Sequence, residues 1–319
     1  MSWVSRDHAQ RRISQRDAPS WRVFHFMHYT KRPLTLDEQV DLLVSRGLLI
    51  SDRARAKRWL ERTSYYRLSA YFLPIKIRDT DRYYSGATFE AVLDLYKFDA
   101  RLRVLVLQGI ERIEVAARAS MVYEIAHTLG PFAYANPANF SPGFDHAKLM
   151  DEITTERSRS REAFVEHFGR KYYLEPHLPI WMVSELLSLG AVSMMYKGFP
   201  RHLQRKISDH FQIAEGPFKS WLHTLNYIRN VCAHHNRLWN RQLAIAPAIP
   251  HEFPYSVPSN NRVYAVVMLM QHVLEIIAPR CRWKDRVMCL ILEHSNVPLM
   301  QMGFPANWKN VEPWKTSKL

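Results

Sequence analysis

Apolar residues recur every three or four positions along most of the chain, a spacing that predicts helices almost throughout. The longest such stripe begins after Thr88, a good helix N-cap residue, and continues to Gly130-Pro131. We expect one long helix there, or two helices with a bend near Gly109. No stretch alternates apolar and polar residues for long enough to require a sheet. The expected fold class is therefore all-α.

Shorter helices are expected on both sides of this long one. Thr35-Leu36-Asp37-Glu38 is a capping box and Gly47 a stop signal, which together predict a helix over residues 36–46. A second helix should begin near Ser51, and two short helices before the aromatic run 64–75 could form a DNA-binding helix-turn-helix or a packed helical hairpin. The other helical segments expected are 145–168, 180–196, 217–238, 261–278 and 284–294.

These segments suggest an organisation around one helical core. The expected divisions of the chain are a basic flexible arm over 1–33, a helical subdomain over 34–87, a core over 88–240, and a C-terminal loop with helices over 241–319.

The composition adds a strong positive charge to this picture. The chain has 44 basic and 30 acidic residues, a formal net charge of +14, and most of the cations are arginine. Arginine pairs with phosphate oxygens and stacks on bases, so this excess favours nucleic acid over lipid headgroups as a partner. A basic surface kept for solubility is the alternative.

The cysteines and the apolar runs exclude several classes of protein. Cys232, Cys281 and Cys289 form no close pair, so we expect no disulfide framework, no structural metal site and a cytoplasmic location. The apolar run 263–270 is far shorter than the ~20 residues of a membrane span. The first 22 residues lack the apolar segment of a secretory signal.

The segment RNVCAHHNRLWNR, residues 229–241, concentrates the candidate chemistry. On a helix Asn230 and His234 share a face, whereas Arg229 and His234 lie roughly 140° apart around the axis. Either the Arg229 side chain reaches around, or the helix ends after Ala233, or a second subunit supplies the same motif by two-fold symmetry.

Such a cluster suits cleavage of RNA by attack of the ribose 2′-OH on the adjacent phosphate. Histidine, with an ordinary pKa of ~6.5, serves as base or acid. Arginine supplies positive charge for the phosphate oxygens, and no metal or other cofactor is needed. Asn230 could orient the imidazole of His234 or bind a phosphate.

Three alternatives stay open for the same residues. His234 and His235 with Cys232 could bind a metal, although their spacing does not close a tetrahedral site. Cys232 could act as a nucleophile, although it lies on the apolar side with Ile228. Arg229 and His234 could also serve only to stabilise a helix end.

The sequence RNVCAHH resembles the R-x₄-H signature of HEPN-domain ribonucleases. Longer blocks together resemble the Abi-like family, the AbiD/AbiF proteins of bacterial abortive infection, and the resemblance spans about residues 34–295. The blocks that carry it are YYRLSAYFLPIK (65–76), LYKFDARLRVLVLQGIERIEVAARA (95–119), PIWMVSELLSLGAVSMMY (179–196) and WLHTLNYIRNVCAHHNRLWNR (221–241).

The resemblance implies a HEPN-type helical bundle, a homodimer with a composite ribonuclease cleft, metal-independent cleavage and a toxin used in phage defence. It makes Arg229, Asn230 and His234 the catalytic residues. It also implies association with a structured non-coding RNA. The further residues then expected to contact RNA are His235, Arg237, Asn240 and Arg241.

Residues outside the motif are less specific. Glu111 and Glu114 could orient Arg229 or His234, or Glu114 could pair with Arg118 at helical spacing. Glu185 lies in an apolar segment and is expected to face a buried cation. Tyr66 and Arg67 could stack on RNA bases or belong to the core.

Two further classes of function compete with the ribonuclease hypothesis. One is a non-catalytic RNA-binding protein of the same fold, in which Arg229 and His234 only grip phosphate. The other is a DNA-binding regulator built on residues 34–75.

Overall fold

The computed structural model describes residues 32–315, and this part of the chain is built from helices. It contains twelve α-helices, a few short 3₁₀ helices and no β-strand between residues 32 and 315. The all-α prediction is confirmed. The basic arm predicted over residues 1–33 lies almost wholly outside the described residues.

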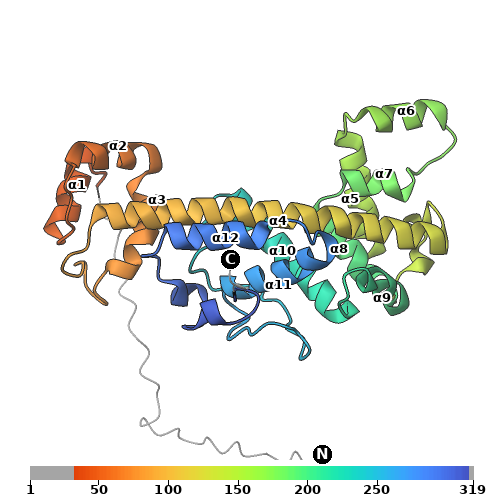
Figure 1. Cartoon of the computed structure of the whole chain (residues 1–319). Coiled ribbons are helices and arrows are strands. Elements are labelled where there is room, and N and C mark those ends of the chain that lie inside the picture. Colours follow the sequence, from red (N-terminus) through yellow and green to blue (C-terminus); the bar gives the residue numbers. More distant parts are fainter. Residues whose placement is uncertain (1–31, 316–319) are drawn as a thin grey trace, which may run out of the picture.

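Helix α4 (Phe89–Leu129) is the axis of the molecule, and most of the other helices pack along it (Figure 1). Its 41 residues span about 60 Å at the rise of an α-helix. The Thr88 hydroxyl caps the first turn by accepting from Ala91 N at 3.1 Å, and Gly130 ends the helix at φ +92°. The sequence therefore predicts both ends of this helix correctly.

Gly109 has a packing role in α4. A Cβ atom there would clash with Met270 Cε and would lie 3.1 Å from Trp283 Nε1. Met270 belongs to α11 (Val263–Ile277) and Trp283 begins α12 (Trp283–Glu293). The missing side chain lets these two helices approach α4 closely, and α4 continues through this position as one helix.

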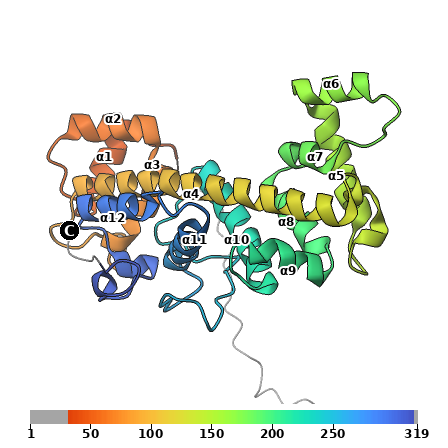
Figure 2. The same ribbon diagram turned by 45° about the vertical axis from the view of Figure 1, so that its right-hand side comes forward.

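Three short helices lie at the N-terminal end of α4, and the third of them packs against it (Figure 1). They are α1 (Leu36–Ser45), α2 (Arg53–Thr63) and α3 (Tyr65–Phe72). The predicted capping box is present, because Glu38 N donates to Thr35 Oγ1 at 3.3 Å and Thr35 N donates to Glu38 Oε2 at 2.7 Å. Figure 2 shows α1 and α2 rising at one end of α4 and α5–α7 at the other.

The far end of α4 carries five helices. These are α5 (His146–Arg159), α6 (Ala163–Lys171), α7 (Ile180–Leu186), α8 (Leu189–Gly198) and α9 (Arg201–Asp209). The single helices predicted over 145–168 and 180–196 are each divided in two. The second division occurs because Leu187 and Ser188 are extended and the Ser188 hydroxyl caps α8 by accepting from Ala191 N at 3.2 Å.

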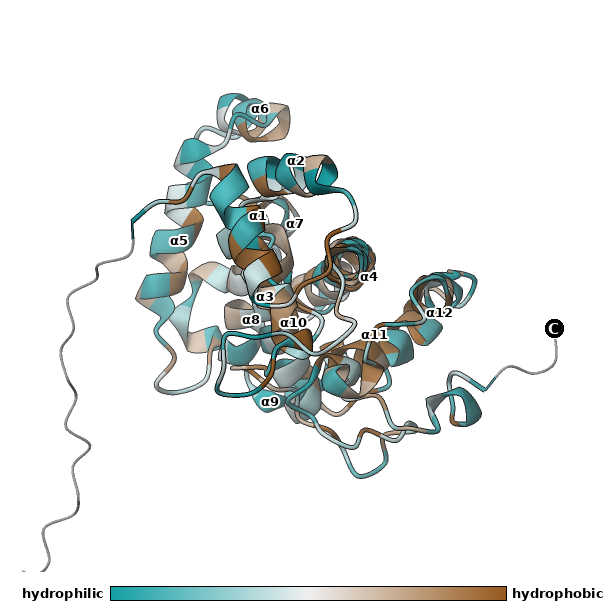
Figure 3. Cartoon of the chain, turned by 90° about the vertical axis from the view of Figure 1, so that its left-hand side faces the viewer, coloured by the Kyte–Doolittle hydropathy of each residue, from teal (hydrophilic) through white to brown (hydrophobic). Residues whose placement is uncertain are grey.

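Helix α10 (Glu215–Ala233) packs between α4, α8 and α9, and α11 is buried along most of its length. In Figure 3, α11 is largely hydrophobic in colour whereas α2 and α5 are largely hydrophilic. Buried residues from Val40 to Trp314 belong to one hydrophobic cluster. The boundaries expected at residues 87 and 240 stay predictions.

No helix within residues 32–315 has both the length and the apolar character needed to cross a bilayer.

The loop after α10 is held by an aromatic cluster that contains His272. The centroid of this imidazole lies 5.4 Å from that of Phe253 and 6.1 Å from those of Trp221 and Tyr255. Burial lowers the pKa of His272, while the carboxylate of Glu275 opposes that shift. The folded state therefore favours the neutral ring.

This shift predicts a pH dependence of stability. The contribution of neutral His272 is complete above the unfolded pKa of ~6.5 and is lost as the pH falls towards the lower folded pKa. We expect the loss of Tm between pH 7 and pH 5 to be smaller in His272→Leu than in the wild type. Thermal denaturation at both pH values measures it, and the exposed His251→Leu is the control. Equal losses in all three proteins would contradict the prediction.

Candidate functional site

The Arg-x₄-His motif lies at the exposed C-terminal end of α10. Arg229, Asn230 and His234 are exposed, whereas Val231 and Cys232 between them are buried. Arg229 Nη1 donates to Asn230 Oδ1 at 3.3 Å, which is the sole hydrogen bond of that guanidinium within residues 32–315. The His234 imidazole has none within the same range. Both groups are therefore free to meet a ligand.

Helix α10 ends earlier than the predicted residue 238. Ala233 is its last residue and His234 is the C-cap. His235 takes a left-handed conformation, with φ +56°, and Asn236 N bonds back to Val231 O at 2.9 Å. Of the three arrangements considered above, the helix does end after Ala233. No hydrogen bond joins Arg229 to His234 within the described chain.

A buried carboxylate holds the chain that leaves the motif. Asp99, on α4, is fully buried, and its Oδ1 accepts from Leu238 N at 3.1 Å and from Trp239 N at 2.7 Å. Its Oδ2 accepts from the Tyr71 hydroxyl at 2.6 Å and from the Arg103 guanidinium. Four donors on one carboxylate fix where the chain turns after His235.

The Asp99 network was not predicted as part of the site. Burial raises the pKa of the Asp99 carboxyl, whereas the Arg103 charge and the hydrogen bonds from Tyr71, Trp239 and Leu238 oppose that shift. The available signal was an Asp and an Arg four residues apart in an otherwise apolar stripe. Unpaired charges are costly to bury, so such a pair indicates a buried polar contact.

The predicted RNA-contacting residues after the motif are held mainly by the protein itself. Arg237 is half-buried and its Nη1 donates to Ala70 O at 2.8 Å, and burial lowers its pKa. Arg241 Nε donates to Arg237 O at 2.8 Å. Asn240 Oδ1 is buried with no hydrogen-bond partner among the described residues. Contacts of these side chains with RNA stay predictions.

Helix α3 brings two of the predicted RNA-binding residues beside the motif. Arg67 Nη1 donates to His235 O at 2.8 Å, although the two residues are 168 positions apart. Tyr66 is 87% exposed and does not belong to the core. His235 is exposed as well, so this edge of the site offers an aromatic ring and polar side chains to solvent.

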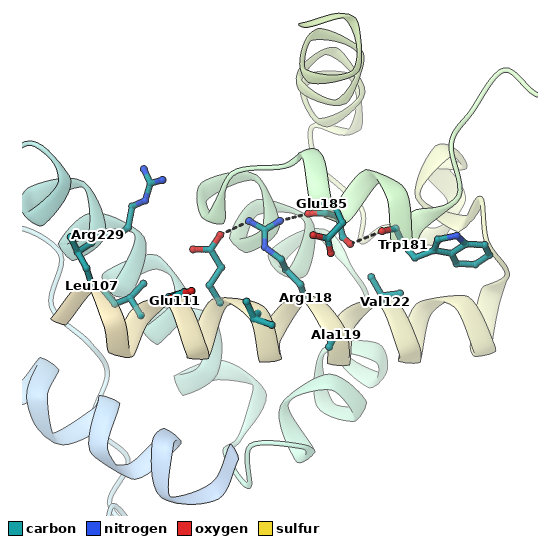
Figure 4. Close-up of a pocket in the computed structure, with 12 residues that line it drawn as sticks. Leu107, Glu111, Arg118, Ala119, Val122, Trp181, Glu185 and Arg229 are labelled. Atoms are coloured by element: carbon teal, nitrogen blue, oxygen red, sulfur yellow. Dashed lines mark hydrogen bonds and ion pairs between the residues drawn. The ribbon is translucent and has the colours of Figure 1, made fainter. Parts of the chain in front are cut away.

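A groove of about 530 Å³ runs from Arg229 along α4 to Trp181 on α7 (Figure 4). Glu111 and Glu185 both line it and are exposed. The prediction that Glu185 faces a buried cation is wrong. Ile180, Val183 and Ser184 form the buried face of α7, which leaves Glu185 on the outer face one turn after Trp181.

The second predicted supporting residue, Glu114, is paired within the groove. Its carboxylate accepts from Arg118, whose guanidinium also donates to Ser184 O. The alternative of a Glu114–Arg118 pair is therefore what the structure contains. Glu111 makes no hydrogen bond to Arg229 or His234. Neither carboxylate orients the motif within one chain.

Cys232 is placed unlike a nucleophile or a metal ligand. The side chain is 1% exposed, and burial raises the pKa of the thiol to about 12. A protonated, buried thiol is inert. His234 and His235 are exposed, so their rings do not converge with Cys232 on one ion. No group of three or more potential metal ligands occurs between residues 32 and 315.

These features define a class: an all-helical protein that exposes an Arg-x₄-His motif at a helix end, beside a groove. The chain belongs to the family described as Abi-like protein, whose model matches residues 58–240, more than half of its length. Membership implies a role in abortive infection, a form of phage defence, and makes a nuclease role possible. No curated protein and no solved structure matches the chain significantly.

Proposed function

We propose that this protein is a metal-independent endoribonuclease toxin of the HEPN type, which acts in the cytoplasm as a homodimer during abortive infection. The observation that carries the proposal is that the two key side chains of the motif are accessible to a ligand. Arg229 and His234 are exposed and, among residues 32–315, the only side chain hydrogen-bonded to either of them is that of Asn230, whereas the neighbouring Arg237 and Arg241 are hydrogen-bonded within the protein.

The chemistry needs proton transfer and a fixed positive charge. The His234 imidazole takes the proton of the ribose 2′-OH or returns one to the leaving 5′ oxygen. Arg229 stabilises the charge that develops on the phosphorane. Asn230 lies beside the Arg229 guanidinium and limits its orientation. The products would be a 2′,3′-cyclic phosphate and a free 5′-hydroxyl.

A second copy of the chain would supply both an acid and a base. One chain offers a single motif histidine with no link to Arg229, and two-fold symmetry would bring two His234 and two Arg229 side chains to one cleft. Val104 is 55% exposed on α4, the helix that packs against α10, and provides apolar surface for such an interface.

RNA is the partner most consistent with the charge of +14, both as substrate and as an associated non-coding RNA. A DNA-binding role for residues 34–75 has less support. Two cations of α2, Arg53 and Lys57, are paired with Asp41 and Asp37 of α1. These pairs are typical of a helical hairpin stabilised within the protein.

The decisive experiment compares the wild type with His234→Ala on bacterial RNA in the presence of EDTA. We expect cleavage with 2′,3′-cyclic phosphate ends and a loss of at least about 10²-fold in the variant, with RNA binding retained. Growth inhibition on expression should be lost in parallel. His223→Ala, an exposed histidine on the same helix, is the matched control and should behave as wild type.

Two results would reject the proposal. Equal cleavage by His234→Ala and the wild type would remove the histidine from the chemistry. RNA binding without any cleavage, together with unchanged growth on expression, would favour the non-catalytic RNA-binding protein.

A further inference from the structure

The groove beside Arg229 is long enough for several linked units of a polymer such as a single-stranded nucleic acid, and longer than one small molecule requires. Its floor follows α4 from Leu107 to Val122, which corresponds to about 22 Å of helix. Arg229 lies at the Leu107 end and Trp181 at the Val122 end, as Figure 4 shows. A ligand that touches the motif therefore continues naturally along the groove.

Some polar groups of the groove are hydrogen-bonded within the protein, and others are available to a ligand. Glu114, Arg118 and the carbonyl of Ser184 are hydrogen-bonded to one another. Glu111 and Glu185 are exposed and make no hydrogen bond or ion pair with any residue between 32 and 315. The groove thus presents two carboxylates that only accept hydrogen bonds and one guanidinium that only donates them.

The apolar part of the groove suits planar rings. Val115 is 60% exposed on its floor and Trp181 is 48% exposed on its wall. Stacking of a base on an aromatic side chain contributes about 1–3 kcal/mol and is tolerant of sequence. Trp181 and Glu185 lie one turn apart on the same face of α7, so a base stacked on the indole has a carboxylate beside its edge.

We propose that this groove binds the single-stranded RNA adjoining the cleaved phosphate, and that Glu111 and Glu185 select guanine over uracil there. The inference rests on the proposed function, because Arg229 is taken to hold the phosphate. Glu111 lies one helical turn from Leu107 at the Arg229 end, so it reads the nearest base. Glu185 and Trp181 hold a base further along.

The selectivity follows from hydrogen-bonding patterns. Guanine presents adjacent N1–H and N2–H₂ donors on its Watson–Crick edge, which match the two oxygens of a carboxylate. Uracil presents one N–H between two carbonyl oxygens, and these oxygens repel a carboxylate. Unpaired bases expose this edge whereas a duplex hides it, so the substrate must be single-stranded at the cut.

The charges of the groove also set the direction of the strand's backbone. Free carboxylates repel phosphates, so the phosphates lie away from Glu111 and Glu185, one phosphate is held by Arg229 at its end of the groove, and the bases point towards the two carboxylates. A second copy of the chain is the competing occupant of this surface. RNA is favoured because the groove includes Arg229, a residue of the motif itself.

Binding is tested without catalysis by using full-length His234→Ala protein. Titration with 3′-GMP and with 3′-UMP, followed by tryptophan fluorescence, should show at least about tenfold tighter binding of 3′-GMP. Adding Glu111→Gln or Glu185→Gln should reduce that preference severalfold, because an amide replaces one acceptor oxygen by a donor. Trp181→Phe should remove the fluorescence change, and Glu61→Gln, an exposed carboxylate on α2, is the control.

Cleavage of a random-sequence RNA pool then tests the position of the base. Wild-type cuts should be enriched in guanine next to the cleaved phosphate, and Glu111→Gln should lose that enrichment while Glu61→Gln keeps it. Selective 3′-GMP binding by a protein that cuts no RNA would support the groove and reject the nuclease. Cleavage without base preference, or equal binding of both nucleotides, would overturn the groove proposal and leave the nuclease standing.

The competing occupant has its own outcome. If Glu111→Gln or Glu185→Gln changes the molar mass measured by light scattering but not nucleotide binding, the groove is a contact between two copies and the proposal is wrong.

Discussion

Asp99→Ala is expected to lower the free energy of unfolding by about 3–5 kcal/mol, the cost of removing one partner from a buried ion pair. The substitution leaves the Arg103 guanidinium buried beside a hydroxyl, and it leaves Leu238 N and Trp239 N without acceptors. Because these donors hold the chain after the motif, RNA cleavage should fall as well, even at temperatures where the variant stays folded.

Urea denaturation followed by circular dichroism measures the effect. Asp94→Ala is the matched control, since Asp94 lies on the same helix and accepts from His294 at 2.8 Å but is 39% exposed. We expect about 1 kcal/mol or less for it. The loss of unfolding free energy in Asp99→Asn should lie between those of Asp99→Ala and Asp94→Ala, because the amide keeps one oxygen for the backbone donors. Equal destabilisation by Asp99→Ala and Asp94→Ala would show that the network is not a special determinant of stability.

Arg229→Ala should lower the rate of RNA cleavage by about 10²–10³-fold, as expected for loss of a charge aimed at the transition state. Its effect on stability should stay within about 0.5 kcal/mol, because the side chain is exposed and Asn230 is its only hydrogen-bond partner in the described part of the chain. Arg229→Lys should recover part of the rate, since an ammonium keeps the charge but not the planar fork.

Single-turnover cleavage at saturating protein separates rate from binding. Arg112→Ala removes an exposed arginine from α4 outside the groove and should leave the rate unchanged. A loss in Arg229→Ala that appears only as weaker RNA binding, with the saturated rate preserved, would mean that Arg229 grips phosphate without taking part in the reaction.

Local signals account for what could be predicted about the helices. Thr35 and Thr88 cap the first turns of α1 and α4 through hydrogen bonds to residues three positions later, so their effect is visible in a short window of sequence. Gly109 shows the limit of such signals. Its sequence context allows a bend, but its actual role is the close approach of Met270 and Trp283, which are more than 150 residues away.

The functional site likewise has some features that the sequence predicts and others that it does not. Spacing alone places Asn230 and His234 on one face of a helix, and the family resemblance, now confirmed, adds Arg229. Spacing does not show that α10 stops at Ala233, because the stop depends on Asp99 accepting from residues about 140 positions later. Nor does it show that Glu185 faces the groove, since that depends on which side of α7 packs on α4.

The sequence by itself determined that this chain is helical, strongly basic and equipped with an Arg-x₄-His motif, because periodicity, charge and spacing are properties of neighbouring residues. Only the tertiary structure decided which charged side chains are exposed to solvent and which are buried in contacts within the protein. Burial and long-range hydrogen bonds engage Asp99, Arg103 and Arg237, whereas Arg229, His234 and Glu111 stay exposed. The free energy of a charged group depends on what the folded chain places around it, and that is set by contacts between residues far apart in sequence.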